Sequence, residues 1–388
     1  MGVIGTHENT GLPSTEKGKE HKGNRIEIIQ LVRGIAALLV CFLHMKGAIK
    51  QSEVADLLFR NGSIGVPLFF IISGFIMYTT TLNTELRFRA VLSFWGKRIL
   101  RIAPFYFLCT LLYLAIYSKL GLFLLEHPRW LLPTLFFYPT YGSFTGPAYG
   151  FPPLEVGWSL NYEIYFYLLI GLFMFAGRWR WAFLSGFIIL CVLVVPYFSN
   201  GYVMQTLRQW YAYPLPYFSL MTNPVLLFFI SGIGLGKLYH TAFKLNSLLA
   251  ARILVVMSSV NLLLTYLNTI PLFHAYWHHW VNCTLVLFAL LMRDKIKPYN
   301  LPRFLVYLGN ISFSIYLMHP LVIGVLPKLY RKLHLPLHTE GWMYFFQLLI
   351  LVLITSAISF SFIEKPLNRL SDRLFQLPKK TTLNRANP

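Results

Sequence analysis

An arginine and a histidine in the first apolar stretch are the residues whose types and spacing best suit chemistry. Arg33 and His44 lie eleven residues apart in IQLVRGIAALLVCFLHM. In an α-helix this spacing puts both side chains on one face, about 16 Å apart along the axis. A histidine titrates near neutral pH, so His44 could take a proton from a hydroxyl or be acylated itself. The simpler alternatives are snorkelling of Arg33 to the headgroups and an interfacial histidine.

Two further arginines begin a later apolar stretch, in GKRILRIAPFYFL. Arg98 and Arg101 are three residues apart and therefore share a helical face. The planar guanidinium suits phosphate oxygens, so the pair could form a phosphate clamp together with Arg33. The alternative is the basic flank that many membrane helices carry on their cytoplasmic side.

A lone carboxylate, Glu163, stands in the apolar stretch WSLNYEIYFYL, near Trp158 and Tyr162. A carboxylate within an apolar span is rare and needs a partner. His44 is predicted at a compatible depth, so Glu163 could orient its imidazole or bind an acceptor. The alternative is a buried ion pair with an arginine.

Three other groups of residues complete the candidates. Ser73 and Gly74 form a small pair that permits close helix contact. Tyr316 and His319 share a helical face, and Pro320 predicts a kink beside them. No metal site is predicted, because no carboxylate accompanies the spaced histidines, and the cysteines form no CxxC pair. These residues are His274, His278 and His279, and Cys41, Cys109, Cys191 and Cys283.

The elements that must hold these residues are membrane helices. The chain is 56% apolar and only 12% charged, too few charges for a soluble protein of 388 residues. The net charge of +20 does not indicate nucleic-acid binding, because the basic residues lie in short clusters between apolar runs. We predict an all-α integral membrane protein of about ten transmembrane helices, at roughly 26–45, 64–82, 99–118, 158–176, 181–198, 223–239, 248–267, 275–292, 304–326 and 342–363.

The distribution of lysine and arginine predicts the orientation. With ten spans, most basic residues fall in the segments on the side of the N-terminus, so both termini are predicted to be cytoplasmic. Residues 1–24 are polar and are expected to form a disordered cytoplasmic tail. Residues 25–366 form the transmembrane domain, and 367–388 form a second cytoplasmic tail.

Taken together, these motifs resemble the membrane acyltransferase-3 family, the integral-membrane O-acyltransferases that modify bacterial exopolysaccharide, lipopolysaccharide and peptidoglycan. The resemblance runs from about Arg25 to Pro366 and is strongest to the exopolysaccharide-modifying members. The chain departs from the family where Ile164 and Tyr165 follow Glu163, and it ends 22 residues after Pro366 without an esterase-like domain. The matching positions, in family order, are Arg33 and His44; Phe69, Phe70, Ser73 and Gly74; Arg98, Arg101, Pro104 and Tyr106; Trp158, Ser159, Leu160 and Glu163; Tyr316, Leu317 and His319; and Glu364, Lys365 and Pro366.

The resemblance implies an enzyme of the bacterial inner membrane that moves an acyl group from acetyl-CoA to a hydroxyl of a cell-surface or lipid-linked glycan. It implies acetyl-CoA as the donor and no permanently bound cofactor. It implies His44 and Glu163 as catalytic residues and Arg33, Arg98 and Arg101 as the acetyl-CoA site. Ser73, Trp158, Tyr162, Tyr316 and His319 would line the substrate pocket. A flippase of lipid-linked sugars, or a structural partner of a polysaccharide synthase, would account for the membrane helices but not for the spacing of Arg33 and His44.

Overall fold

The computed structural model describes residues 26–375 except 51, 83, 85–86, 118–127, 140–145, 151, 205, 210, 212, 268–275 and 335–339. Both predicted tails lie outside these residues, apart from 367–375. Every regular element in the described part is helical, which confirms the all-α prediction. The α-helices are α1 Glu27–Met45, α2 Glu53–Phe59, α3 Gly65–Thr81, α4 Phe88–Tyr117, α6 Pro128–Leu135, α7 Trp158–Phe173, α8 Arg180–Ile189, α9 Val195–Asn200, α10 Pro216–Met221, α11 Leu226–Tyr239, α12 Leu248–Leu267, α13 Tyr276–Ile296, α14 Arg303–Asn310, α15 Ser312–Lys332, α16 Trp342–Ser359 and α17 Lys365–Leu374.

Every predicted span overlaps helical structure, but the span 304–326 is divided between α14 and α15, and 181–198 includes both α8 and α9. Fewer than ten helices are long and apolar enough to cross a bilayer on their own. Gly177 has φ of 62°, a conformation that suits glycine, and it separates α7 from α8 within one apolar segment. Helix α11 is shorter than a full span, and α13 carries charges in its last turns. Among the described residues the candidate spans number seven: Glu27–Ile49, Glu53–Thr81, Phe88–Tyr117, Glu155–Asn200, Leu248–Leu267, Ser312–Lys332 and Trp342–Leu374. The protein is therefore a multi-pass membrane protein.

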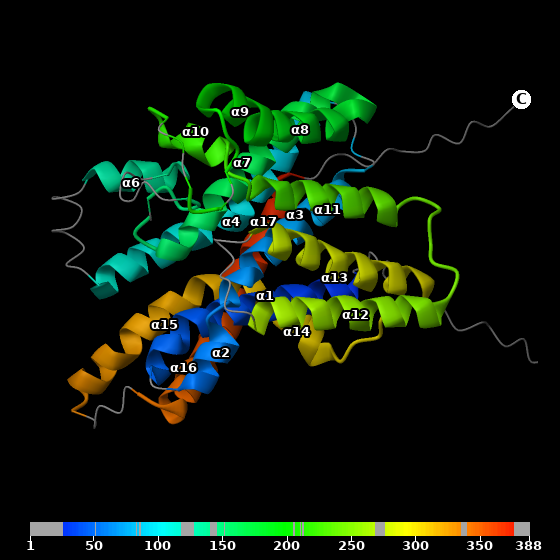
Figure 1. The fold of residues 1–388 in the computed structure, drawn as a ribbon. Helices are drawn as coiled ribbons and strands as arrows, with labels where there is room; N and C mark the ends of the chain where they lie inside the picture. The colour runs from blue at the N-terminus through cyan, green and yellow to red at the C-terminus, as the bar shows by residue number, and fades with distance from the viewer. Residues whose placement is uncertain are drawn as a thin grey trace, which may run out of the picture.

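Five helices surround the candidate residues. Helix α1 packs against α3 and α15, α4 packs against α7 and α15, and α3 also contacts α7. In Figure 1, α15 and α16 lie side by side, and α12 and α13 form a separate pair at the other end of α1. Helix α15 continues through Pro320, and the kink predicted beside His319 stays a prediction.

Close packing of α3 on α11 depends on small residues, as the Ser73–Gly74 pair predicted. A Cβ atom at Gly74 would overlap the carbonyl oxygen of Phe229, and one at Gly232 would overlap that of Ile71. Backbones in membranes pack closely where such small residues meet. This contact holds Ser73 in a fixed position on α3.

We expect Gly74→Val to destabilise the protein, because the added methyl groups must separate α3 from α11. Overpacking of this kind costs about 1–3 kcal/mol. Thermal unfolding in detergent should show a clear fall in midpoint. Gly234→Val on α11 is the matched control, since a Cβ atom there meets nothing within 4 Å. Equal midpoints for the two variants would contradict this assignment.

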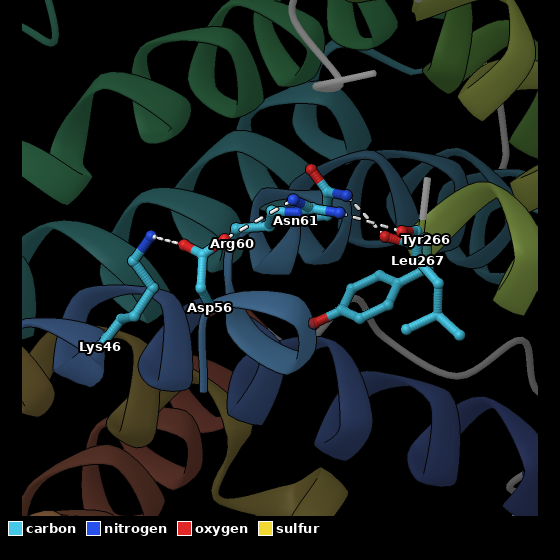
Figure 2. A network of polar contacts seen from close by, with 6 residues as sticks. All are labelled: Lys46, Asp56, Arg60, Asn61, Tyr266 and Leu267. Atoms are coloured by element: carbon cyan, nitrogen blue, oxygen red, sulfur yellow. Dashed lines mark hydrogen bonds and ion pairs between the residues drawn. The ribbon is translucent and has the colours of Figure 1, made fainter. Parts of the chain in front are cut away.

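A polar network fixes the turn that follows His44. Lys46 binds Asp56 at 2.6 Å, and Arg60 lies 3.5 Å from the same carboxylate. Arg60 also donates to the carbonyl oxygen of Leu267 at 3.0 Å, and the Asn61 amide donates to that of Tyr266. Figure 2 shows these contacts joining the end of α1 and helix α2 to the end of α12. The network therefore anchors the end of α1 that bears His44.

Candidate active site

One cavity collects the three predicted arginines. It lies between α1, α3, α4, α7 and α15, and we call it the arginine cavity. The arginine side chains are half-buried, whereas Ser73 and Tyr316 are buried. Its polar lining consists of Arg33, Ser73, Arg98, Arg101, Ser159, Glu163, Tyr167, Ser312 and Tyr316.

The positive charge of this cavity is not neutralised by direct ion pairs. Within the described residues, no carboxylate lies within 4.0 Å of these three guanidinium groups. Arg98 lies over the rings of Phe94 and Tyr167, 5.7 Å from each centroid. Arg33 interacts at longer range with Glu163 and with Glu364 of the closing motif. Arg98 likewise interacts at longer range with Glu163 and Asp372. Because no carboxylate among the described residues is in direct contact with them, the three guanidinium groups can still bind an anion.

The Glu163 side chain lines the arginine cavity and does not lie against His44. Its carboxylate accepts hydrogen bonds from the hydroxyls of Tyr167 and, at 3.5 Å, Ser73. No hydrogen bond joins it to His44 in the described structure, so the structure does not bring the carboxylate to the imidazole that it was predicted to orient. The reason is depth: α7 begins at Trp158, and five residues carry Glu163 about 7.5 Å further along the helix.

The orienting partner of His44 is the backbone of its own helix. His44 Nδ1 lies 2.9 Å from the carbonyl oxygen of Val40. A carbonyl oxygen can only accept, so Nδ1 donates in this hydrogen bond, which leaves Nε2 as the ring nitrogen whose lone pair can take up a proton. His44 is exposed, and its lone pair is therefore available to a substrate. This arrangement suits a general base.

A second histidine lies beside the first. The rings of His44 and His319 are 4.9 Å apart between centroids. His319 is fully buried, and its Nδ1 lies 3.1 Å from the carbonyl oxygen of Ile315. Its Nε2 has no hydrogen-bond partner among the described residues. The structure thus brings together two residues that the sequence placed in separate motifs.

His44 borders two further cavities. The first, which we call the Trp158 cavity, also contains Ser63, Glu155 and Arg208. The second, which we call the Arg331 cavity, lies between the turn after α1, α15 and α16. Val66 and Tyr316 line both the arginine cavity and the Trp158 cavity. The arginine cavity and the Trp158 cavity therefore share a wall formed by Val66 and Tyr316. The three cavities lie along α1 from Arg33 to His44.

Hydrogen bonds hold the wall of the Trp158 cavity. The hydroxyl of Tyr316 bonds with Ser159 Oγ at 2.8 Å and donates to the carbonyl of Val156 at 2.8 Å. The buried hydroxyl of Tyr162 donates to the carbonyl of Pro147 at 2.7 Å. Burial raises the pKa of Tyr149, so its phenol stays neutral and accepts from the Asn223 amide. These hydrogen bonds thus hold in place the loop that contributes Pro147 to the Trp158 cavity.

The remaining candidates fall outside these cavities. Tyr162 supports the wall and does not line any of the three. The described residues contain no group of three side chains suited to a metal, and His274 lies outside them. All four cysteines are free and buried, as the sequence indicated.

Sequence reasoning missed several lining residues. Tyr167 is four residues after Glu163 and could have been found from helical spacing. Glu155 and Arg208 have no such signal, because segments outside the long helices bring them to the Trp158 cavity. Arg331 lies in the last turn of α15, where a basic residue is common and marks no cavity.

Comparison with known proteins decides the family. Residues 26–363 match the acyltransferase domain family, and this range contains every residue that lines the three cavities. The chain belongs to this family. It is therefore a transferase enzyme, an O-acyltransferase with a multi-pass membrane domain.

Two relatives illustrate the acyltransferase family. The chain is 30% identical over 285 residues to the exopolysaccharide production protein ExoZ of Rhizobium meliloti, covering 70% of this chain and 79% of that protein. It is 23% identical over 346 residues to the O-acetyltransferase OatA of Staphylococcus aureus, covering 82% of this chain and 55% of that protein. No solved structure matches the acyltransferase described here.

Proposed function

We propose that the enzyme transfers an acetyl group from cytoplasmic acetyl-CoA to a hydroxyl of a cell-surface or lipid-linked glycan. The observation that carries this proposal is the row of cavities along α1, with unpaired arginines at one end and His44 at the other. The names of the two relatives support the proposal in part: one names O-acetyl transfer and the other names exopolysaccharide production.

The arginine cavity would bind the phosphates of CoA. Arg33, Arg98 and Arg101 present guanidinium groups that match phosphate oxygens. The long neutral arm of CoA would then pass Val66 and Tyr316 and bring the thioester to His44. Arg33 and His44 are about 16 Å apart along α1, a span that such an arm can cover.

The Trp158 cavity would bind the acceptor sugar. Trp158 offers an apolar face to the ring, while Glu155 and Arg208 offer hydrogen bonds to hydroxyl groups. His44 Nε2 would take the proton of one hydroxyl as its oxygen attacks the thioester carbonyl carbon. The carbon–sulfur bond breaks, the proton passes to the CoA sulfur, and the ester and CoA leave.

Purified protein incubated with radiolabelled acetyl-CoA and glycan tests this function. We expect label in the glycan and release of free CoA in equal amounts. A flippase would move the glycan across a vesicle membrane without transferring label. Glycan translocation without ester formation would rule out the proposed reaction.

The proposed orientation places the arginine cavity on the cytoplasmic side of the bacterial inner membrane. It follows from ten spans with both termini inside, as the distribution of basic residues predicts. A reporter enzyme fused after Pro388 should be active only when it is one that works in the cytoplasm. Activity of a periplasm-specific reporter at that position would refute the orientation.

A further inference from the structure

The Arg331 cavity borders His44 but has no part in the reaction proposed above. Its volume is about 380 Å³, and it opens to the surface. Its two basic lining side chains are His44 and Arg331. The uncharged lining consists of Met45, Gly47, Ala48, Ile323, Pro327, Tyr344 and Leu348.

Arg331 is the distinctive residue of this cavity. It is exposed, and no carboxylate among the described residues lies within 4.0 Å of its guanidinium group. The last turn of α15 carries Arg331 and Lys332, whose positive charges suit the negative end of the helix dipole. Only Arg331 of the two lines the cavity. A cation on an apolar cavity fits an amphiphile that carries an anionic group.

The surroundings of the cavity indicate where such an amphiphile would come from. Helix α15 exposes Val325 and Leu329, and α16 exposes Phe346 and Ile350, each by 40% or more. Exposed apolar side chains on membrane-spanning helices face the hydrocarbon of the bilayer. A molecule entering between α15 and α16 would therefore come from the lipid phase.

We propose that the Arg331 cavity binds the phosphate-bearing end of the membrane lipid that carries the acceptor sugar. The inference rests on the proposed function and specifies its acceptor as a lipid-linked sugar. Arg331 holds the lipid phosphate through its forked donors, and the apolar lining contacts the first part of the chain. The sugar then extends past His44 into the Trp158 cavity, because His44 borders both.

Two variants test the site from different directions. Arg331→Gln removes the charge, and Gly47→Leu adds volume to the lining of the cavity, at a position where a Cβ atom meets nothing within 4 Å. Lys332→Gln is the matched charge control, and Gly186→Leu is the matched control for added volume. Each would be assayed with a short-chain lipid-phosphate-linked sugar and with the same sugar as a water-soluble methyl glycoside.

For the lipid-linked acceptor, we expect KM to rise at least about tenfold in Arg331→Gln and Gly47→Leu. We expect kcat/KM for the methyl glycoside to stay within about twofold of wild type, and both controls to resemble wild type with both acceptors. Equal losses with the two acceptors, or no loss with the lipid-linked one, would overturn the site. If wild type transfers acetyl groups to neither acceptor, the proposed function itself fails, and the site fails with it.

Discussion

Replacing His44 with glutamine should lower acyl transfer by at least about 100-fold, as much as replacing it with alanine. General-base catalysis contributes roughly 10²- to 10⁴-fold in rate, and glutamine cannot accept a proton at neutral pH. Glutamine does keep hydrogen-bonding capacity. A residue that only positioned the acceptor would therefore retain appreciable activity in the glutamine variant, whereas a base would not.

The assay is acetylation of the surface glycan at matched abundance of each variant in the membrane. His278→Gln is the matched control, because His278 is exposed and lies outside the three cavities. Near wild-type acetylation in His44→Ala would end the catalytic assignment. The chemistry would then move to His319, the buried imidazole beside it.

Replacing Arg98 with alanine should weaken acetyl-CoA binding about 10- to 100-fold. Hydrogen bonds to charged groups contribute about 1.5–3 kcal/mol each, and every 1.4 kcal/mol is a factor of ten in affinity. Arg98→Lys should restore the affinity only in part, because lysine binds phosphate as a point charge and lacks the fork. Equilibrium binding of labelled acetyl-CoA to purified protein measures both effects.

Arg89→Ala is the control for the arginine variant. Arg89 is exposed on the same helix, α4, and does not line the arginine cavity. We expect Arg33→Ala and Arg101→Ala to weaken binding as well. Unchanged affinity in all three cavity variants would show that these arginines do not bind the phosphates of acetyl-CoA.

Features that depend on residues within one helix could be predicted from the sequence. Helical spacing put Arg33 and His44 on one face of α1, and the structure places both along the same row of cavities. The arginines of α4 were placed in the same way. The length of the apolar stretches predicted every helix that bears a candidate residue, because the thickness of the hydrocarbon layer sets how many residues a span needs.

Features that depend on how helices meet could not be predicted in this way. The predicted depth in the membrane suggested that Glu163 lies near His44. Because α7 begins at Trp158, Glu163 lies further along the helix and lines the arginine cavity. The pairing of His44 with His319 joins residues 275 positions apart, and only the packing of α15 on α1 creates it.

The central claim is that binding and chemistry occur at opposite ends of α1. The most direct test measures acetyl-CoA affinity and single-turnover acyl transfer on the same purified preparations of wild type, His44→Gln and Arg98→Ala. The account predicts that His44→Gln binds acetyl-CoA as tightly as wild type and transfers almost nothing. It predicts that Arg98→Ala binds weakly and regains transfer at saturating donor. Loss of donor binding in His44→Gln together with normal binding in Arg98→Ala would contradict it.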